Sequence, residues 1–264
     1  MLVTGGSGFL GRHLLGSDAT RDWEVVAPPS QTLDVTKAEL VAETIRDWKP
    51  TAVVHLAYRR DDARVIVQGS ANVARAAAAV GAHLVHLSTD VVFGGRPQPY
   101  LETDAVSPIT DYGTWKADAE QRVIAAHPNA ALVRTSLIYG TDVMAPVQRD
   151  VELALGGRSS MTFFTDEFRC PVHATDLARA VAALADRRDI NGPIHVAGPE
   201  AIDRASLARV VARWMGASAE QVAGMRTSTI AGSGLVRPAC VVLDTSLATS
   251  LGLACRPVSE VLQM

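Results

Sequence analysis

The glycine spacing near the start of the sequence constrains the fold more than any other feature. Leu2-Val3-Thr4 has the apolar and β-branched character of a short strand, and Gly5, Gly8 and Gly11 follow it in a G-x-x-G-x-x-G pattern. Glycines at the first two positions allow a tight turn and a close approach of the backbone to a pyrophosphate, whose charge meets N–H groups at a helix start. The third lets the helix pack close to the sheet. The pattern predicts a dinucleotide-binding strand–turn–helix unit.

Short apolar runs alternate with longer helical segments over the first 140 residues. Strands are expected at 24–27, 52–56, 83–87 and 131–134, and helices at 37–48, at 65–80 and from 112 onward. This alternation is typical of an α/β protein, and it predicts a Rossmann-type doubly wound parallel sheet over residues 1–140. A later segment, of about residues 166–197, is expected to return to this domain. Residues 141–165 and 198–264 are predicted to form a small C-terminal α/β substrate-binding region over the carboxyl edge of the sheet.

Composition excludes several functional classes. The chain has 264 residues, 48% of them hydrophobic, and its net charge of −3 comes without a basic cluster, so neither nucleic acid nor an anionic membrane is expected as a partner. The three cysteines lack metal-ligand spacing, so they are expected to be reduced and no metal site is predicted. No apolar run is long enough to span a bilayer, and the glycine motif comes too early for a signal peptide. A cytoplasmic protein is therefore predicted.

Two further patterns point to chemistry. Tyr112 and Lys116 are four residues apart in a predicted helix, which places phenol and ammonium on one face, and a nearby cation favours the phenolate. Ser88-Thr89-Asp90 directly follows a predicted strand, and hydroxyls at that end of an open sheet point into its ligand crevice. Alone, the first pattern is more often a solvated helix face and the second a turn with local hydrogen bonds. Their occurrence together favours a catalytic site.

The combined motifs resemble those of the extended short-chain dehydrogenases/reductases. Within that superfamily the chain is most similar to dTDP-4-dehydrorhamnose reductases, and the similarity covers nearly its whole length. The matching segments are the glycine motif, Ser88 to Gly94, Tyr112-x-x-x-Lys116 and Arg134 to Gly140, with further matches at Leu33 to Thr36, Ala57-Tyr58, Asp176 to Ala178, Arg237-Pro238 and Leu243-Asp244.

The resemblance implies a role for each matching residue. Tyr112 would be the general acid that protonates the alkoxide formed when hydride reaches a carbonyl carbon, and Thr89 would hydrogen-bond the carbonyl oxygen. Lys116 would hold the nicotinamide ribose and lower the pKa of the phenol. The implied cofactor-binding residues are Gly5, Gly8, Phe9, Leu10, Gly11, Asp34, Val35, Leu56, Ala57, Tyr58, Ser88, Tyr112 and Lys116.

Three residues are candidates for substrate binding. Asp90 follows Thr89 directly, and Arg169 and Arg237 are candidates for the diphosphate of a nucleotide-sugar. For each arginine the alternative is a structural hydrogen bond to backbone carbonyls. Ile66 stands where the superfamily often has an asparagine, so a proton relay through that asparagine does not carry over. Leu137 replaces a tryptophan of the rhamnose-pathway enzymes, so the identity of the substrate does not carry over either.

An absence bears on the choice of cofactor. A carboxylate at the end of the second strand would bind the ribose 2′-OH of NAD and repel the 2′-phosphate of NADP. Residues 27–30 of this chain are Ala-Pro-Pro-Ser, and nothing among them repels a phosphate. NADP(H) is therefore the predicted cofactor, with NAD(H) as the alternative.

The leading hypothesis is an NADP(H)-dependent oxidoreductase that reduces the 4-keto group of a nucleotide-activated deoxysugar. One alternative is a nucleotide-sugar epimerase that retains NAD. Another is a non-catalytic dinucleotide-binding subunit similar to the regulatory subunit of methionine adenosyltransferase. A homodimer is the assembly considered for any of these.

Overall fold

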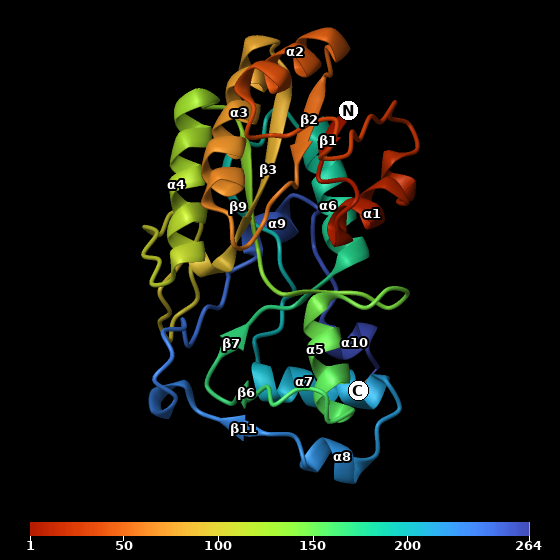
Figure 1. Ribbon diagram of the computed structural model, residues 1–264, viewed down its shortest axis with the longest axis vertical. Helices are drawn as coiled ribbons and strands as arrows, with labels where there is room; N and C mark the ends of the chain where they lie inside the picture. Colours follow the sequence, from red (N-terminus) through yellow and green to blue (C-terminus); the bar gives the residue numbers. More distant parts are fainter. Residues whose placement is uncertain (264) are drawn as a thin grey trace.

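A parallel sheet lies at the centre of the computed structural model, which describes residues 1–263 (Figure 1). Its strand order is β1-β2-β3-β4-β9, and every pairing is parallel. The doubly wound α/β fold predicted from the sequence is confirmed. The five strands are β1 (Leu2–Thr4), β2 (Ala52–His55), β3 (His83–Thr89), β4 (Ala131–Thr135) and β9 (Gly192–His195).

Helices cover both faces of this sheet because neighbouring strand residues are buried on opposite sides. Leu2, Val53, Leu84 and Leu132 belong to one buried cluster, and the next residue of each strand belongs to the other. Side chains alternate along a strand, so a sheet with continuous apolar strands must be covered on both faces. Figure 1 shows α2 (Ala38–Trp48), α3 (Ser70–Ala79) and α4 (Asp111–Ala126) on one face, and α1 (Phe9–Leu15) and α6 (Ala174–Asp186) on the other. The short α9 (Ser246–Ser250) also packs on that second face.

The strand expected at 24–27 is reduced to a single bridge, in which Val26 pairs with Leu2 on the free side of β1. Val3 N donates to Val26 O at 2.8 Å, and Val26 N donates to Met1 O at 3.0 Å. Pro28 and Pro29 have no N–H to continue the pairing, which explains why the strand ends there. The chain therefore crosses β1 from Val26 on one side to β2 on the other. Ligands bind at such a switch point in open α/β sheets.

The glycine motif occupies this switch point. Gly5 has φ +75°, and a Cβ added to it would lie 2.6 Å from Ala57 N. A Cβ on Gly11 would lie 2.4 Å from Gly5 O. The first glycine thus makes the turn, and the third allows α1 to pack against it, as the sequence predicted.

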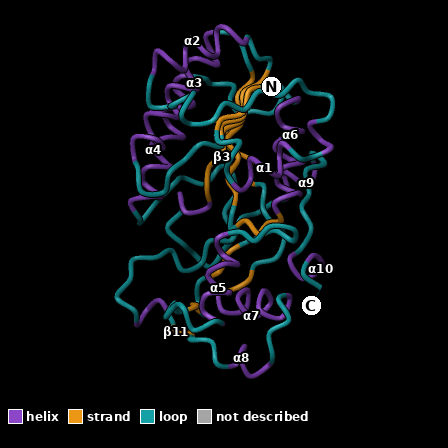
Figure 2. The backbone as a smooth tube through the Cα atoms, turned by 45° about the vertical axis from the view of Figure 1, so that its right-hand side comes forward, coloured by secondary structure: helices purple, strands orange, loops and turns teal. Residues whose placement is uncertain are grey.

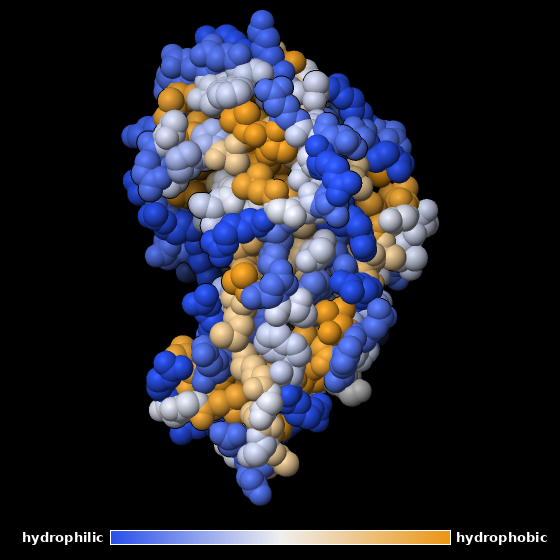
Figure 3. All heavy atoms as spheres, turned by 90° about the vertical axis from the view of Figure 1, so that its right-hand side faces the viewer, coloured by the Kyte–Doolittle hydropathy of each residue, from blue (hydrophilic) through white to orange (hydrophobic). Residues whose placement is uncertain are grey.

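A smaller part of the molecule, formed by segments within 138–173, 202–232 and 258–261, packs below the sheet in the views of Figures 1 and 2. Their core includes Tyr139, Val151, Phe163, Leu207 and Val211, and Figure 3 shows a waist between this part and the part that contains the sheet. Among residues 1–263, no helix has both the length and the apolar character needed to cross a bilayer. The elements here are β5 (Ile138–Tyr139), α5 (Pro146–Leu155), β6 (Phe163–Phe164), β7 (Phe168–Arg169), β8 (Val172–His173), β10 (Ile202–Asp203), α7 (Arg204–Trp214), α8 (Ala219–Ala223), β11 (Thr227–Ser228), η4 (Ile230–Gly232) and α10 (Val258–Val261).

Three short helical segments complete the part that contains the sheet. They are η1 (Asp18–Thr20), the π-helical η2 (Arg64–Gly69), which runs directly into α3, and η3 (Asp90–Val92), which follows β3.

The close approach at Gly5 predicts a stability difference between two glycine variants. Gly5→Ala should lower the free energy of unfolding by about 2–5 kcal/mol, because a left-handed backbone and overpacking both oppose the new Cβ. Gly81→Ala is the matched control, since Gly81 has φ +69° with nothing within 4 Å of the added Cβ; it should cost about 1–2 kcal/mol. Urea unfolding measures both, and equal losses would contradict a tight contact between Gly5 and Ala57.

Candidate active site

The first turn of α4 lies against the carboxyl end of β3. The Thr110 hydroxyl caps the helix by accepting a hydrogen bond from Gly113 N at 3.1 Å. A Cβ on Gly113 would lie 2.3 Å from Val91 O, so only glycine allows the helix to come this close to the turn after β3. One turn further along, Lys116 Nζ donates to Leu87 O at 2.7 Å. These contacts fix the first turns of α4 over the end of the sheet.

The three predicted catalytic side chains meet at this place. The Thr89 hydroxyl lies close enough to the Tyr112 phenol to lower the pKa of that phenol, and it donates to Asp90 Oδ1 at 3.2 Å. The Tyr58 ring, from the segment after β2, lies near both of the other groups: its centroid is 6.4 Å from that of Tyr112 and 5.9 Å from Lys116 Nζ. The hydroxyl, the phenol and the ammonium thus come together from two distant segments of the chain.

Burial controls the electrostatics of this group. Burial raises the pKa of Tyr112 above its ordinary value, Tyr58 adds to the rise, and Arg60, 5.7 Å from the Tyr112 ring centroid, opposes it. The expectation that the phenol has a lowered pKa is therefore wrong for this structure, because loss of water around the phenolate outweighs the effect of the nearby Arg60 cation. Burial also lowers the pKa of Lys116 to about 8, against the opposing effect of Glu120. Tyr112 consequently keeps its proton at neutral pH.

A buried carboxylate holds α4 on the sheet. Glu120 accepts a hydrogen bond from Ser88 Oγ at 2.5 Å, and Arg134 Nη2 of β4 donates to it at 2.8 Å. All three residues are buried. Ser88 was predicted to contact the cofactor, but in the structure its hydroxyl donates to the Glu120 carboxylate of α4.

The glycine loop has the features of a phosphate site. Gly8 is the N-cap of α1 and supplies no side-chain cap. Throughout residues 1–263, the amides of Phe9, Leu10 and Gly11 have no hydrogen-bond acceptor. Leu56 and Ala57 lie directly against Gly5. Unpaired amides at a helix start, on a loop without obstructing side chains, fit the pyrophosphate of a dinucleotide.

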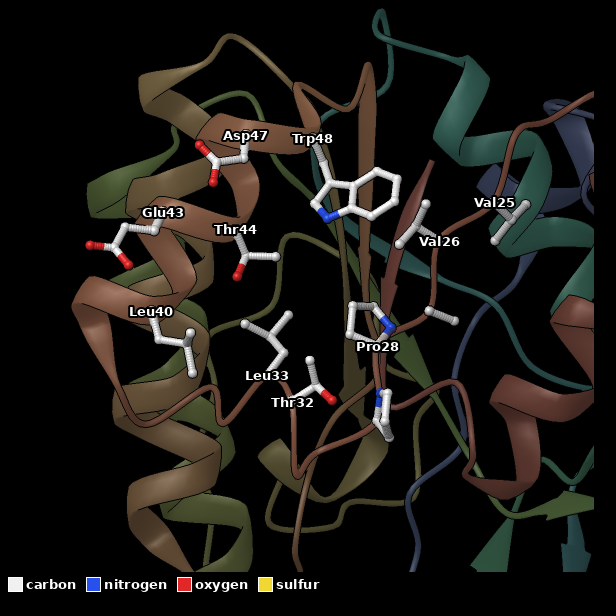
Figure 4. A pocket seen from close by; sticks show the side chains of 12 residues that line it. Val25, Val26, Pro28, Thr32, Leu33, Leu40, Glu43, Thr44, Asp47 and Trp48 are labelled. Carbon is white, nitrogen blue, oxygen red and sulfur yellow. The ribbon is translucent and has the colours of Figure 1, made fainter.

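The expected adenosine end lies at the open edge of the sheet. Ala27, Pro28 and Pro29 line a groove of about 600 Å³ between this edge and α2 (Figure 4). Glu43 and Asp47 also line it, but in Figure 4 their carboxylates point away from Pro28. The groove therefore offers no acid beside the end of the strand that would repel a 2′-phosphate.

Two of the predicted cofactor-binding residues lie in the segment that follows this edge. The carboxylate of Asp34 accepts hydrogen bonds from Thr36 N at 2.9 Å and from Thr36 Oγ1 at 2.7 Å. The Thr36 hydroxyl thereby lowers the pKa of Asp34. Val35 is buried and packs against Gly69, where an added Cβ would lie 2.7 Å from Val35 Cγ2. The segment is thus held in place by its own turn and by η2.

The predicted substrate-binding residues meet in a second cluster. Arg237 donates to both oxygens of Glu167 at 2.8 Å, and Arg169 Nη2 lies 3.4 Å from Glu167 Oε1. Arg169 is buried, its Nε lies 3.7 Å from Asp90 Oδ2, and its other nitrogens donate to backbone carbonyls. Burial raises the pKa of Asp90, and the positive charge of Arg169 opposes this rise. Arg169 thus has the structural hydrogen bonds considered as its alternative role.

Sequence reasoning missed one member of this cluster. Arg204, the first residue of α7, lies beside Glu167, Arg237 and Arg169. Burial lowers the pKa of its guanidinium, and Glu167 opposes this effect. Nη1 is buried and has no hydrogen-bond partner in the described part of the chain. No sequence pattern marks it, because an arginine at a helix start is ordinarily a surface residue.

Comparison with known proteins decides the family. The family model of the RmlD substrate binding domain matches residues 1–263. The chain belongs to this family. Membership confirms the resemblance to extended short-chain dehydrogenases/reductases of the dTDP-4-dehydrorhamnose reductase type that the motifs indicated.

Individual relatives of this RmlD-family chain carry two kinds of name. A dTDP-4-dehydrorhamnose reductase of Mycobacterium tuberculosis is 32% identical, over 84% of this chain and 77% of the relative. Methionine adenosyltransferase 2 subunit beta of Rattus norvegicus is 29% identical, over 97% and 83%. A crystal structure of a Bacillus anthracis dTDP-4-dehydrorhamnose reductase in complex with NADP shares the fold, with a TM-score of 0.87 and 24% identity over 99% of this chain and 96% of that one.

The lowered pKa of Lys116 predicts a pH dependence of stability. The folded protein loses this proton near pH 8, whereas the unfolded chain keeps it to about 10.5, so the unfolded state binds more protons and stability rises with pH between these values. From about pH 7 to about pH 9.5 this contribution is about 2 kcal/mol. The rise should disappear in Lys116→Met and persist in Lys37→Met, whose lysine is exposed. Urea unfolding at both pH values tests this, and identical pH slopes in the two variants would contradict it.

Proposed function

We propose that this protein is an NADP(H)-dependent reductase that reduces the 4-keto group of a nucleotide-activated deoxysugar. The observation that supports it best is the meeting of Thr89, Tyr112 and Lys116 at the carboxyl end of the sheet, beside a glycine loop with unpaired amides. The kinship with a protein named dTDP-4-dehydrorhamnose reductase supports a nucleotide-sugar as the substrate class.

Each residue has a task that follows from its surroundings. Bound NADPH supplies a hydride to the carbonyl carbon. Tyr112 gives its proton to the carbonyl oxygen, and Thr89 donates a hydrogen bond to that oxygen where negative charge develops. Lys116 has three N–H donors and uses one on Leu87 O, which leaves two for the hydroxyls of the nicotinamide ribose.

The buried phenol favours one direction of reaction. The phenol of Tyr112 is protonated at neutral pH and can therefore give a proton, although burial raises its pKa and so makes it a weaker acid than an exposed phenol. Alcohol oxidation would need the phenolate as the base, which the same burial disfavours. The site is therefore suited to carbonyl reduction with NADPH rather than to the reverse reaction.

Replacement of one tyrosine tests the proposal. Tyr112→Phe should lower kcat for NADPH-dependent reduction of dTDP-4-dehydrorhamnose by about 10²–10⁴-fold, since proton transfer is lost while NADPH binding remains within about twofold. Tyr139→Phe is the matched control: its buried hydroxyl has no hydrogen-bond partner among residues 1–263 and lies outside the proposed site, so activity should be retained. NADPH absorbance and fluorescence titration measure the two properties. Full activity of Tyr112→Phe would refute the role of general acid.

The kinship with methionine adenosyltransferase 2 subunit beta supports a second candidate, a dinucleotide-binding regulatory subunit. Under this function the protein binds NADPH, reduces no member of a nucleotide-ketosugar panel, and co-purifies with a partner enzyme. An epimerase would instead carry nicotinamide through purification and return the hydride, with no net change in NADPH absorbance. The same panel separates the three functions.

A further inference from the structure

The edge of the sheet beside β1 is open. Val26 N donates to Met1 O at 3.0 Å, and Val26 O accepts from Val3 N at 2.8 Å. Backbone groups of successive residues in a ladder face opposite sides, so the N–H and carbonyl groups of Val25 and Ala27 face away from β1. Among the described residues, these four groups have no backbone partner. The edge therefore has free donors and acceptors for one further strand.

A tight turn explains why this chain does not supply that strand itself. In the classic doubly wound sheet, a third strand pairs with the outer side of the second one. Here Thr32 N and Leu33 N both donate to Pro29 O at 2.9 Å, so the chain turns toward α2 instead of extending along the edge. The groove between this edge and α2 lies where the third strand of the classic sheet would pair.

The groove has the length and the lining of a strand site. Figure 4 shows Val26 and Pro28 on one side and Leu40 and Thr44 of α2 on the other, with Trp48 at one end. The rise of α2 from Leu40 to Trp48 is about 12 Å, and about four extended residues cover the same length. Apolar side chains thus flank a trough that fits the alternate side chains of a short extended segment.

Charge indicates which kind of segment the groove fits. Glu43 and Asp47 line the groove and are exposed, and neither forms an ion pair with any other residue of 1–263. Two unpaired carboxylates beside an apolar groove favour a segment that alternates basic and apolar residues. A second copy of this chain, paired edge to edge, would bring the same two carboxylates and is disfavoured.

We propose that this edge binds an extended segment of a partner protein, which adds a strand to the sheet and directs basic side chains to Glu43 and Asp47. In such strand addition, main-chain hydrogen bonds give affinity and alternate side chains give specificity. Classic doubly wound sheets hold a dinucleotide and a third strand together, so the segment and NADPH bind at the same time. The inference goes beyond the proposed reductase function and does not depend on it.

A synthetic peptide tests the charge and the location of this site. The probe is a fluorescein-labelled octapeptide of alternating lysine and valine, and its binding is followed by fluorescence polarisation at about 0.15 M salt. Asp47→Lys and Glu43→Lys should each weaken binding about tenfold, as should glutamate in place of lysine in the peptide. Glu152→Lys is the matched control, because Glu152 is an exposed residue of α5 outside the groove; it makes the same charge change and should stay within about twofold of wild type.

Amide hydrogen exchange, measured by NMR, distinguishes strand addition from attraction between side chains alone. The peptide should slow exchange at Val25 and Ala27 at least about tenfold, whereas Phe9 and Leu10 of the glycine loop should keep their rates. Saturating NADPH should leave the affinity for the peptide within about twofold, since a third strand and a dinucleotide occupy different places.

Four results would overturn the proposal. Wild type might bind no lysine–valine peptide, or bind it without slower exchange at Val25 and Ala27. NADPH might displace the peptide, which would assign the whole groove to the cofactor. Sedimentation might show a wild-type dimer that the peptide dissociates, which would assign the edge to a second copy of the chain. None of these results depends on whether ketosugars are reduced, so the strand site and the proposed function stand or fall separately.

Discussion

The carboxylate of Glu120 determines where the predicted catalytic groups of α4 lie. Ser88 of β3 and Arg134 of β4 both donate to it, so one buried charge joins α4 to two adjacent strands. Its pairing is obligatory, because an uncompensated buried carboxylate would be strongly destabilising. Tyr112, Lys116 and Glu120 are spaced i, i+4 and i+8 on one face of α4, so fixing Glu120 in the sheet also fixes the phenol and the ammonium over the end of β3.

Features encoded in neighbouring residues were predictable from the sequence. The glycine spacing, the alternation of apolar runs and the Tyr112–Lys116 interval are local patterns, and they gave the fold class and the turn geometry at Gly5 and Gly11. The expected strand at 24–27 was also a local inference. It failed because pairing needs a partner on the open side of the sheet and N–H groups beyond Val26, where the chain has two prolines.

Properties set by burial were not predictable in the same way. Spacing placed Lys116 near Tyr112, but the direction of the tyrosine pKa depends on how much water the fold removes from the phenol. Likewise, Glu120 and Arg134 are 14 residues apart on a helix and a strand, and nothing in the sequence pairs them. Arg204 is a similar case, since no local pattern indicates that its Nη1 is buried without a hydrogen-bond partner among residues 1–263.

The distribution of charge gives the molecule two chemically different clusters. At Tyr112, burial keeps the phenol neutral and lowers the pKa of the Lys116 ammonium. At the arginine cluster, Arg169 and Arg237 are paired with Asp90 and Glu167. In the proposed reaction, the uncharged carbonyl of a nucleotide-sugar would therefore lie at the Tyr112 end, because an anionic group would gain little beside a buried phenol. Short contacts at Thr89 and Tyr112 would then position that carbonyl.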